Sequence, residues 1–581
     1  MVKFTIPLQM ARRGCREFPI WDDEILHLLM ADNSDGEDEL QLDDEDQQFQ
    51  DVENENAKAP AMQETPPNVI PDIVSCETSE DVPNFQWEKN SYVPYVFYKS
   101  EYEFGRINLF SDPQDMLSPM HVFKEMTQLD QLMNDIVVKE SIRYAEQNGR
   151  LFTIDSEEMK AFLGMNFVMS YHVLPTVRHY WSTDEDMGVS FIANVMPRKR
   201  FEQIRQNLHF CNNEDQSQAN DKACKIRPVM NHFNLCFQKA MNNSKRQSID
   251  EHMIKVKGQN IMKQYIKNKP IKWGFKMWCR ADSSTGYLFE FDLYTGKKMN
   301  TEVELGESVV LSLTEQLKGL GCEVYFNDFF NSPALQYKLM KQNIKACGTI
   351  RTNRKNVPKS LPLDENMQRG DIHAESSSGI SFIKWMDIKS VHMLTNFISP
   401  ERNGTVKRRH AGTAEKVNVT CPEVVICYNK HRGGVDLMNQ RKACYEVNRK
   451  VKIKYYLRLF FYLLDIALNN AYVVYVKLHE AQRMEGPLLS SLEYRQHIAR
   501  GLINNYTCRQ RPRPAVVSTE KQRIGTKRIL PEHNMQKVEK MKRCANCAKR
   551  RKENRTNNVC TVCNVHLCFT VKRNCFVEYH N

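Results

Sequence analysis

Hydrophobic positions recur at helical spacing through residues 85–245. They come three or four residues apart, which is the period of a helix that buries one face against a core. The clearest examples are Met159, Phe162, Leu163 and Phe167, followed by Phe201, Ile204 and Leu208. This part of the chain is therefore predicted to be helical, and order is expected to begin near residue 85.

The spacing changes after residue 245, where short strands are predicted. A first strand is favoured at 248–258, and a hairpin is predicted across 274–297, where two alternating runs are joined by the turn segment DSSTG. In the second run one face is formed by Tyr287, Phe289, Phe291 and Leu293. Such a face predicts a half-buried strand.

Helices and strands then alternate. A helix with Val310, Leu313 and Leu317 on one stripe precedes a strand at 323–326. A second helix, at 334–342, precedes a strand at 347–351. Three antiparallel strands followed by helix, strand, helix and strand are the order of a ribonuclease H-like core, so an α/β catalytic domain is predicted.

The remaining segments complete the expected outline. Residues 354–415 are polar and loop-rich apart from a strand-like patch at 383–393, and they are interpreted as an insertion in the core. Helices are again predicted from about residue 437 to residue 510. The most apolar stretch, 455–478, is interrupted by charged residues and asparagines, so it is predicted to be a buried amphipathic helix and not a membrane span.

Charge is distributed unevenly along the chain. The formal net charge is +10, but residues 22–57 carry fifteen Asp or Glu and no Lys or Arg, which leaves +25 on the rest. Residues 1–84 bury too little apolar surface to offset chain entropy and are predicted to be disordered. A basic body beside an acidic tail favours a polyanionic partner.

Cysteines point to metal binding at the C-terminal end. Eighteen cysteines without a predicted secretory signal favour an intracellular protein with reduced thiols. Within 544–581 two CxxC pairs predict zinc, because each pair supplies two thiolates to a tetrahedral site. The candidate ligands are Cys544, Cys547, Cys560, Cys563, His566, Cys568, Cys575 and His580. Eight ligands make two sites, predicted to interleave as a cross-brace, and so short a module needs metal to fold.

A basic segment precedes this module. Residues 521–555 contain thirteen Lys or Arg against three Glu, and 520–543 are interpreted as a linker. The clusters KMKR and KRRK would pair with phosphates and serve as a nuclear import signal. A nuclear location is therefore expected, with a solvated linker face as the plainer interpretation.

Three aspartates lie where such a fold could bring them together. Asp250 falls in the first strand, Asp328 follows the strand at 323–326, and Asp436 comes after two glycines at the expected start of a helix. Transfer of a phosphodiester uses two Mg²⁺ ions about 3.5–4 Å apart, held by a few convergent carboxylates. Singly, each aspartate is more often a turn or cap residue; together they favour a two-metal site.

Seven blocks of sequence resemble successive blocks of piggyBac-type transposases. They are EMKAFLGMNFVMSYHVLPTVRHYW, RFEQIRQNLHF, SIDEHMIKVKG, VYFNDFFNSPAL, GTIRTNRKNVPK, YNKHRGGVDLMNQ and LRLFFYLLDIALNNAY. The resemblance runs from about residue 90 to the end of the chain.

This resemblance implies a ribonuclease H-like catalytic domain held between two halves of a helical dimerisation and DNA-binding domain. It also implies cut-and-paste transposition at TTAA targets by a homodimer that binds double-stranded DNA at transposon ends and uses Mg²⁺ (or Mn²⁺) and Zn²⁺. The expected domains are a disordered acidic region (1–84), two helical parts (85–245 and 437–519), the catalytic domain (246–436), the basic linker (520–543) and the zinc module (544–581).

Matched residue by residue, Asp250, Asp328 and Asp436 correspond to the family's metal-binding aspartates. The family often has a fourth aspartate where this chain has Asn439, which keeps a neutral oxygen but loses a negative charge. The last zinc ligand, His580, replaces a common cysteine. An active transposase is the first hypothesis. The alternatives are a domesticated, DNA-binding nuclear protein without transposition and a zinc-module interaction protein.

Overall fold

The computed structural model describes residues 82–110, 117–215, 221–256, 258–267, 269–296, 304–409, 416–447, 453–484, 486–508, 533–550, 552–570 and 573–580. The predicted disordered region 1–84 lies outside the described residues except for its last three. The chain forms two compact units, Met1–Arg509 and Gln510–Asn581.

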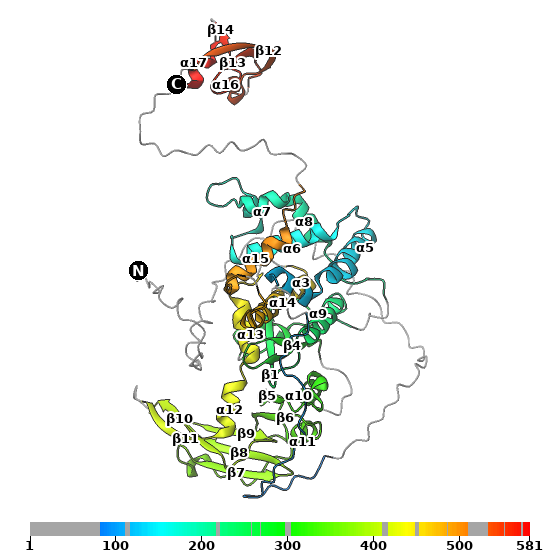
Figure 1. Cartoon of the computed structure of the whole chain (residues 1–581), viewed down its shortest axis with the longest axis vertical. Coiled ribbons are helices and arrows are strands. Elements are labelled where there is room, and N and C mark those ends of the chain that lie inside the picture. Colours follow the sequence, from blue (N-terminus) through cyan, green and yellow to red (C-terminus); the bar gives the residue numbers. More distant parts are fainter. Residues whose placement is uncertain are drawn as a thin grey trace. The chain divides into compact units, whose positions relative to one another are not determined.

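The first unit is built around a mixed sheet of nine strands (Figure 1). The strands are β1 (Arg246–Lys255), β2 (Gln264–Tyr265), β3 (Trp273–Asp282), β4 (Leu288–Leu293), β5 (Glu323–Phe326), β6 (Lys345–Thr349), β7 (Ile372–Ser377), β8 (Ile380–Met386) and β9 (Ser390–Thr395). Their order is β2-β3-β1-β5-β6-β9-β8-β7, with β4 also paired to β3. β3 is antiparallel to both β1 and β4, whereas β1, β5 and β6 run parallel. The predicted ribonuclease H-like fold is confirmed.

The sheet separates two hydrophobic cores, and alternation along β3 shows how. Phe275, Met277 and Cys279 contribute to a core shared with the helical region, whereas Trp278 points to the opposite core together with Ile249 of β1. That second core is closed by the helices α10 (Leu305–Leu313) and α11 (Pro333–Lys341). Because this strand is covered on both faces, β3 is buried at nearly every position.

The segment 354–415 was predicted to be a loop-rich insertion with a strand-like patch at 383–393. That patch falls in β8 and β9, but β7 and a further strand at 403–409 were not predicted. β7, β8 and β9 continue the main sheet beyond β6, and β10 (Asn403–Arg409) pairs with β11 (Lys416–Pro422) as a separate ribbon. The polar residues are built into this sheet. Asn396, for example, accepts a hydrogen bond from the Ala346 amide and donates to the Ile344 carbonyl, so polarity did not indicate a loop.

The first unit contains further helices and short helical turns. They are α3 (Pro119–Thr127), α4 (Leu129–Gln131), α5 (Lys139–Gln147), α6 (Ser156–Tyr171), α7 (Ser190–Val195), α8 (Arg198–Asn207), α9 (Arg227–Ala240), α12 (Glu423–His431), α13 (Gly434–Ala443), α14 (Tyr455–Glu480) and α15 (Ser491–Ile503), with a π-helix, η2 (Leu132–Val138), and the 3₁₀ turns η3 (Val177–Trp181), η5 (Glu315–Leu317) and η6 (Asp364–Asn366). Asp155 caps α6 by accepting a hydrogen bond from the Glu158 amide. Residues of α3 to α9 and of α13 to α15 share one hydrophobic core.

α14, with 26 residues, is the longest helix among the described residues. By length and composition it is the one candidate membrane span among the described residues, but 89% of its most apolar window is buried inside the protein. The predicted buried helix is therefore confirmed, although side chains are buried almost all around it and not on one face only. Its charged residue Asp465 is neutralised by Arg495 of α15, which lets the helix lie in the core.

The second unit is small and rich in cysteine. It contains β12 (Met535–Arg543), β13 (Arg555–Cys560), β14 (Phe569–Thr570), β15 (Arg573–Asn574), α16 (Ala545–Lys549) and α17 (Cys575–His580). β12 pairs with β13, so residues 535–543, which were predicted to belong to the linker, are part of the folded module. The rest of the predicted linker, 520–532, lies outside the described residues.

Candidate active site and metal-binding module

A cavity of about 230 Å³ opens where β1 and β5 lie side by side. Its lining is formed by Ile249, Asp250, Lys269, Phe326, Asn327, Tyr428, Arg432 and Asp436. The parallel pairing matches Ile249 with Phe326, so the residues that follow them, Asp250 and Asn327, reach the cavity together. Asp436 arrives from α13. The register of β1 with β5 and the position of α13 thus bring acidic groups from distant parts of the chain to one cavity.

Asp250 is held firmly at this cavity. Its Oδ1 accepts hydrogen bonds from the Glu251 amide at 2.8 Å and from the Asn327 side chain at 2.9 Å. Burial raises the pKa of its carboxyl to about 7, and the nearby carboxylates of Glu251 and Asp436 act in the same direction, whereas Lys269 opposes them. A carboxylate in this position would gain from a cation in the cavity.

Asp436 lies in the first turn of α13 and keeps surface open to the cavity. The surrounding protein nevertheless removes enough water to raise the pKa of Asp436, against the opposing effects of Lys269 and Arg432. The helix is anchored here because the Val435 amide donates to Ser248 Oγ at 3.2 Å. Two carboxyls of raised pKa therefore face one polar cavity.

Asp328 is placed differently from these two. Its carboxylate forms an ion pair with Arg351, with Arg351 Nε 2.7 Å from Oδ2, and 41% of its side chain is exposed. It does not line the cavity. Among the described residues, the groups of three or more ligand atoms that lie within 4.8 Å of one another are both in the C-terminal module. The structure thus brings Asp250 and Asp436 together, and the full triad stays a prediction.

The donor set at the cavity suits a divalent cation. Carboxylate oxygens are the ligands that Mg²⁺ prefers, and the site leaves room for the waters that Mg²⁺ keeps. Lys269 supplies the resident positive charge: burial acts to lower its pKa, but the carboxylates of Asp250 and Glu251 raise it. Its Nζ lies 3.2 Å from Glu251 Oε1.

Several lining residues were not found from the sequence. Tyr428 lies in α12 and Arg432 follows the end of that helix, whereas Asp436 lies in α13, so no single helical repeat links the three residues in the sequence. Lys269 also had no sequence signal, because its place depends on the path of the loop between β2 and β3. Asn439 does not line the cavity; its Oδ1 is buried and has no hydrogen-bond partner among the described residues. A metal-directed role for Asn439 stays a prediction.

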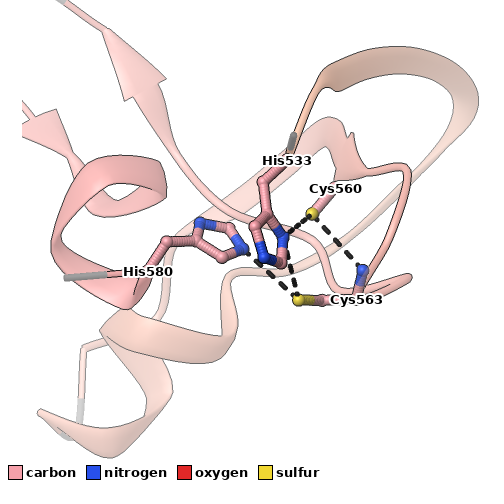
Figure 2. A group of neighbouring side chains, drawn as sticks. All are labelled: His533, Cys560, Cys563 and His580. Atoms are coloured by element: carbon pink, nitrogen blue, oxygen red, sulfur yellow. Dashed lines mark hydrogen bonds between the residues drawn. The ribbon is translucent and has the colours of Figure 1, made fainter. Parts of the chain in front are cut away.

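The C-terminal unit brings its cysteines and histidines into two groups of four. One contains Cys544, Cys547, Cys568 and Cys575; the other contains His533, Cys560, Cys563 and His580, as Figure 2 shows. Cys547 Sγ lies 3.9 Å from Cys568 Sγ and 3.5 Å from Cys575 Sγ. Zn–S bonds of about 2.3 Å in a tetrahedron imply S···S separations of roughly 3.8 Å, so the thiols are spaced to hold zinc.

The predicted interleaving is present, but one ligand assignment is corrected. His566 belongs to neither group, and its Nδ1 is hydrogen-bonded to the Thr556 carbonyl at 2.9 Å. His533 takes the place expected for it, with Nδ1 3.4 Å from the sulfurs of both Cys560 and Cys563. His533 was missed because it lies in the segment interpreted as a linker.

Comparisons with known proteins concern the family and the fold of this chain. A family model described as Transposase IS4 matches residues 118–472. The chain is 32% identical over 370 residues to the PiggyBac transposable element-derived protein 2 of Homo sapiens, covering 61% of each protein. It is 30% identical over 382 residues to PiggyBac transposable element-derived protein 3 of Homo sapiens, covering 63% of each. The matched part thus spans less than two thirds of either relative.

A solved structure shows the same fold. It is a piggyBac transposase determined by cryo-EM in a synaptic complex with hairpin DNA. The TM-score is 0.60 at 19% sequence identity, and the match covers 80% of this chain and 97% of the other. At this identity the likeness concerns the fold alone.

Proposed function

The chain belongs to the piggyBac transposable element-derived protein family, and on that premise we propose that it cleaves and transfers DNA strands in a divalent-metal-dependent reaction. The substrate is double-stranded DNA at transposon ends and TTAA targets, the acting form is a homodimer, and the location is the nucleus. One observation carries the proposal: Asp250 and Asp436, both with raised pKa, face the same polar cavity.

The residues at the cavity have separate roles. Asp250 and Asp436 would hold Mg²⁺ or Mn²⁺, with Asp328 joining them from the adjacent end of β5. When bound there, such a metal would activate the nucleophile and stabilise the leaving oxygen. Asn327 orients Asp250 through its hydrogen bond. Lys269 and Arg432 offer positive charge to the phosphate and limit the repulsion among the carboxylates.

Arg351 has a defined part in this proposal. Arg351 neutralises Asp328 through their ion pair. Arg351 would be released from this pair if Asp328 turned toward a bound metal. A freed guanidinium at that point would bind a DNA phosphate with two parallel hydrogen bonds. Recruitment of Asp328 and binding of the DNA backbone are then linked steps.

Cleavage of DNA by the purified full-length protein tests the proposal. With Mg²⁺ and DNA that carries the flanking ends of its own gene, the wild type should nick the DNA. Asp250→Asn and Asp436→Asn should each lower the rate by at least about a hundredfold while DNA binding is kept, since a metal ligand is lost without a change of shape. Glu315→Gln alters an exposed carboxylate paired with Lys318 and should behave as wild type. Absence of metal-dependent cleavage in the wild type would remove the enzymatic claim.

The ion pair between Asp328 and Arg351 supports a second candidate. In a domesticated derivative, Asp328 would stay with Arg351, and the fold would bind DNA without cutting it. In that case all the carboxylate variants would bind DNA as the wild type does and none would cleave. Terminal inverted repeats flanked by TTAA around the gene would favour the active enzyme instead.

The C-terminal unit completes the proposal. Its two groups of four ligands would bind two Zn²⁺ ions and so stabilise a module with little hydrophobic core of its own. The basic residues of β12, including Lys540 and Lys542, are exposed and suited to phosphate contacts. This module would recognise transposon ends.

A further inference from the structure

Two aromatic side chains are exposed side by side at the edge of the main sheet. Tyr265 of β2 and Trp273 of β3 are direct partners across the antiparallel pair. They are 51% and 54% exposed, and their ring centroids lie 4.8 Å apart with 45° between the ring planes. Single exposed apolar residues are ordinary, but a contiguous aromatic pair beside a candidate active site indicates a binding surface.

The surroundings of this pair are strongly basic. From residue 252 to residue 281 the chain has seven lysines and one arginine, with no Asp or Glu. Lys263 Nζ lies 5.4 Å from the centre of the Trp273 ring. Lys267 and Lys272, in the loop that joins the two strands, are exposed and form no ion pair with any residue that the structure describes. An occupant of the surface should therefore carry negative charge.

The same loop reaches into the candidate active site. Lys269 lines the cavity with Asp250 and Asp436, and it lies four residues from Tyr265 and four from Trp273. Four residues span at most about 14 Å of chain, which corresponds to roughly four nucleotides at about 3.4 Å each. A strand that is bound at the cavity can therefore pass over the aromatic pair.

We propose that Tyr265 and Trp273 form a stacking platform for unpaired bases of single-stranded DNA, with Lys263, Lys267 and Lys272 bound to its phosphates. Base stacking on an aromatic ring accepts any base, because every base has a π face. In an intact duplex the bases are already paired and stacked, so the platform selects strands that are opened next to the cavity. The identification of the strand as DNA rests on the proposed function.

Photocrosslinking without added divalent metal tests the platform independently of cleavage. The probe is a single-stranded oligonucleotide that contains 5-iodouracil, and it is incubated with the full-length protein. Crosslinks should map to Tyr265 or Trp273. The double variant Tyr265→Leu/Trp273→Leu, which keeps apolar bulk but removes both rings, should bind the single strand about tenfold more weakly. Its affinity for duplex DNA should change less than about twofold.

Matched variants separate stacking from other effects. Trp273→Phe keeps a ring and should stay near the wild type. Tyr98→Leu removes another exposed aromatic residue, 73% exposed, and should have no effect. Lys267→Gln and Lys272→Gln should each reduce the slope of log affinity against log salt by about 0.7 for single strands.

Each outcome decides the proposal. Crosslinks that map elsewhere, or an equal loss of single-strand and duplex binding in the double variant, overturn it. So does capture of a protein segment by the platform with single-strand binding unchanged. If the protein never cleaves DNA but shows the expected crosslinks and loss of affinity, the stacking platform is supported. Only the proposed enzymatic function is then contradicted.

Discussion

At the scale of single residues, the candidate site is defined by two carboxyls of raised pKa, those of Asp250 and Asp436. Asp250 accepts two hydrogen bonds and still has a pKa raised to about 7, because burial and neighbouring negative charge outweigh Lys269. Asp328, only one residue beyond the lining residue Asn327, is open to solvent and paired with Arg351. Two acids of the expected triad therefore have different surroundings.

The raised pKa of Asp250 predicts a pH dependence of stability. Unfolded, its carboxyl has an ordinary pKa of about 3.9. At a pH between these two pKa values, the folded protein binds the Asp250 proton more tightly than the unfolded chain does. The stability that this proton contributes is therefore full below about pH 4 and is lost as pH rises through about 7. Without added metal, the wild-type Tm should fall from about pH 5 to about pH 8 by more than that of Asp250→Asn, which stays neutral. Parallel Tm curves from thermal unfolding would contradict this.

The sequence indicated the acids of the site better than their partners. Asp250, Asp328 and Asp436 could be chosen because each stands at the end of an element or inside a recognisable block. Lys269 could not, because only the fold carries the loop after β2 back to the cavity. The ion pair of Asp328 with Arg351 was also hidden, since it joins the end of β5 to the loop after β6.

At the scale of elements, the position of α13 depends on a close approach of backbones. A Cβ on Gly434 would lie 2.5 Å from the Asp282 carbonyl oxygen and 2.6 Å from Ser248 Oγ. On the sheet side, Gly286 has φ +68°, and a Cβ added there would lie 2.7 Å from the Met438 amide nitrogen. Asp436 is brought to the cavity because no side chain separates this helix from the ends of β1 and β3.

Adjacent glycines of α13 provide a matched pair of variants. Gly434→Ala should push the helix away from β1, lower stability by about 1–3 kcal/mol and reduce cleavage, because the neighbouring backbone cannot move freely. Gly433→Ala has no atom within 4 Å of the added Cβ and an ordinary negative φ, so it should leave both unchanged. Chemical denaturation and the cleavage assay measure the two effects. Equal behaviour of the two variants would show that contact at Gly434 does not position α13.

Element prediction succeeded where the hydrophobic period was clear. The strand expected at 323–326 is β5, and the helix expected at 334–342 is α11 within one residue at each end. Within 354–415 the strand-like patch expected at 383–393 falls in β8 and β9, but β7 and β10 were missed. Buried polar side chains such as Lys384 and Thr395 made the extent of these strands hard to predict. These residues are satisfied by tertiary partners, for instance Lys384 by Asp364, which no local pattern reveals.

At the scale of the whole molecule, the two compact units rely on different forces. The first buries extensive apolar cores on both sides of a sheet, and two helical segments far apart in the chain share one of them. The second has a core made mostly of cysteines. A boundary drawn from composition placed the start of this unit at residue 544, but β12 and His533 show that its fold begins at least eleven residues earlier.

That boundary leads to a prediction about zinc. The full-length protein should contain about two Zn²⁺ per chain by elemental analysis, and a chain ending at residue 532 should contain none. His533→Ala should lose about one Zn²⁺, because it removes one of four ligands from the group with Cys560, Cys563 and His580 and leaves the Cys544 group intact. His566→Ala should keep both ions, since His566 belongs to neither group of four ligands. Loss of zinc from His566→Ala with full retention in His533→Ala would reverse the assignment and restore residues 520–543 as a linker.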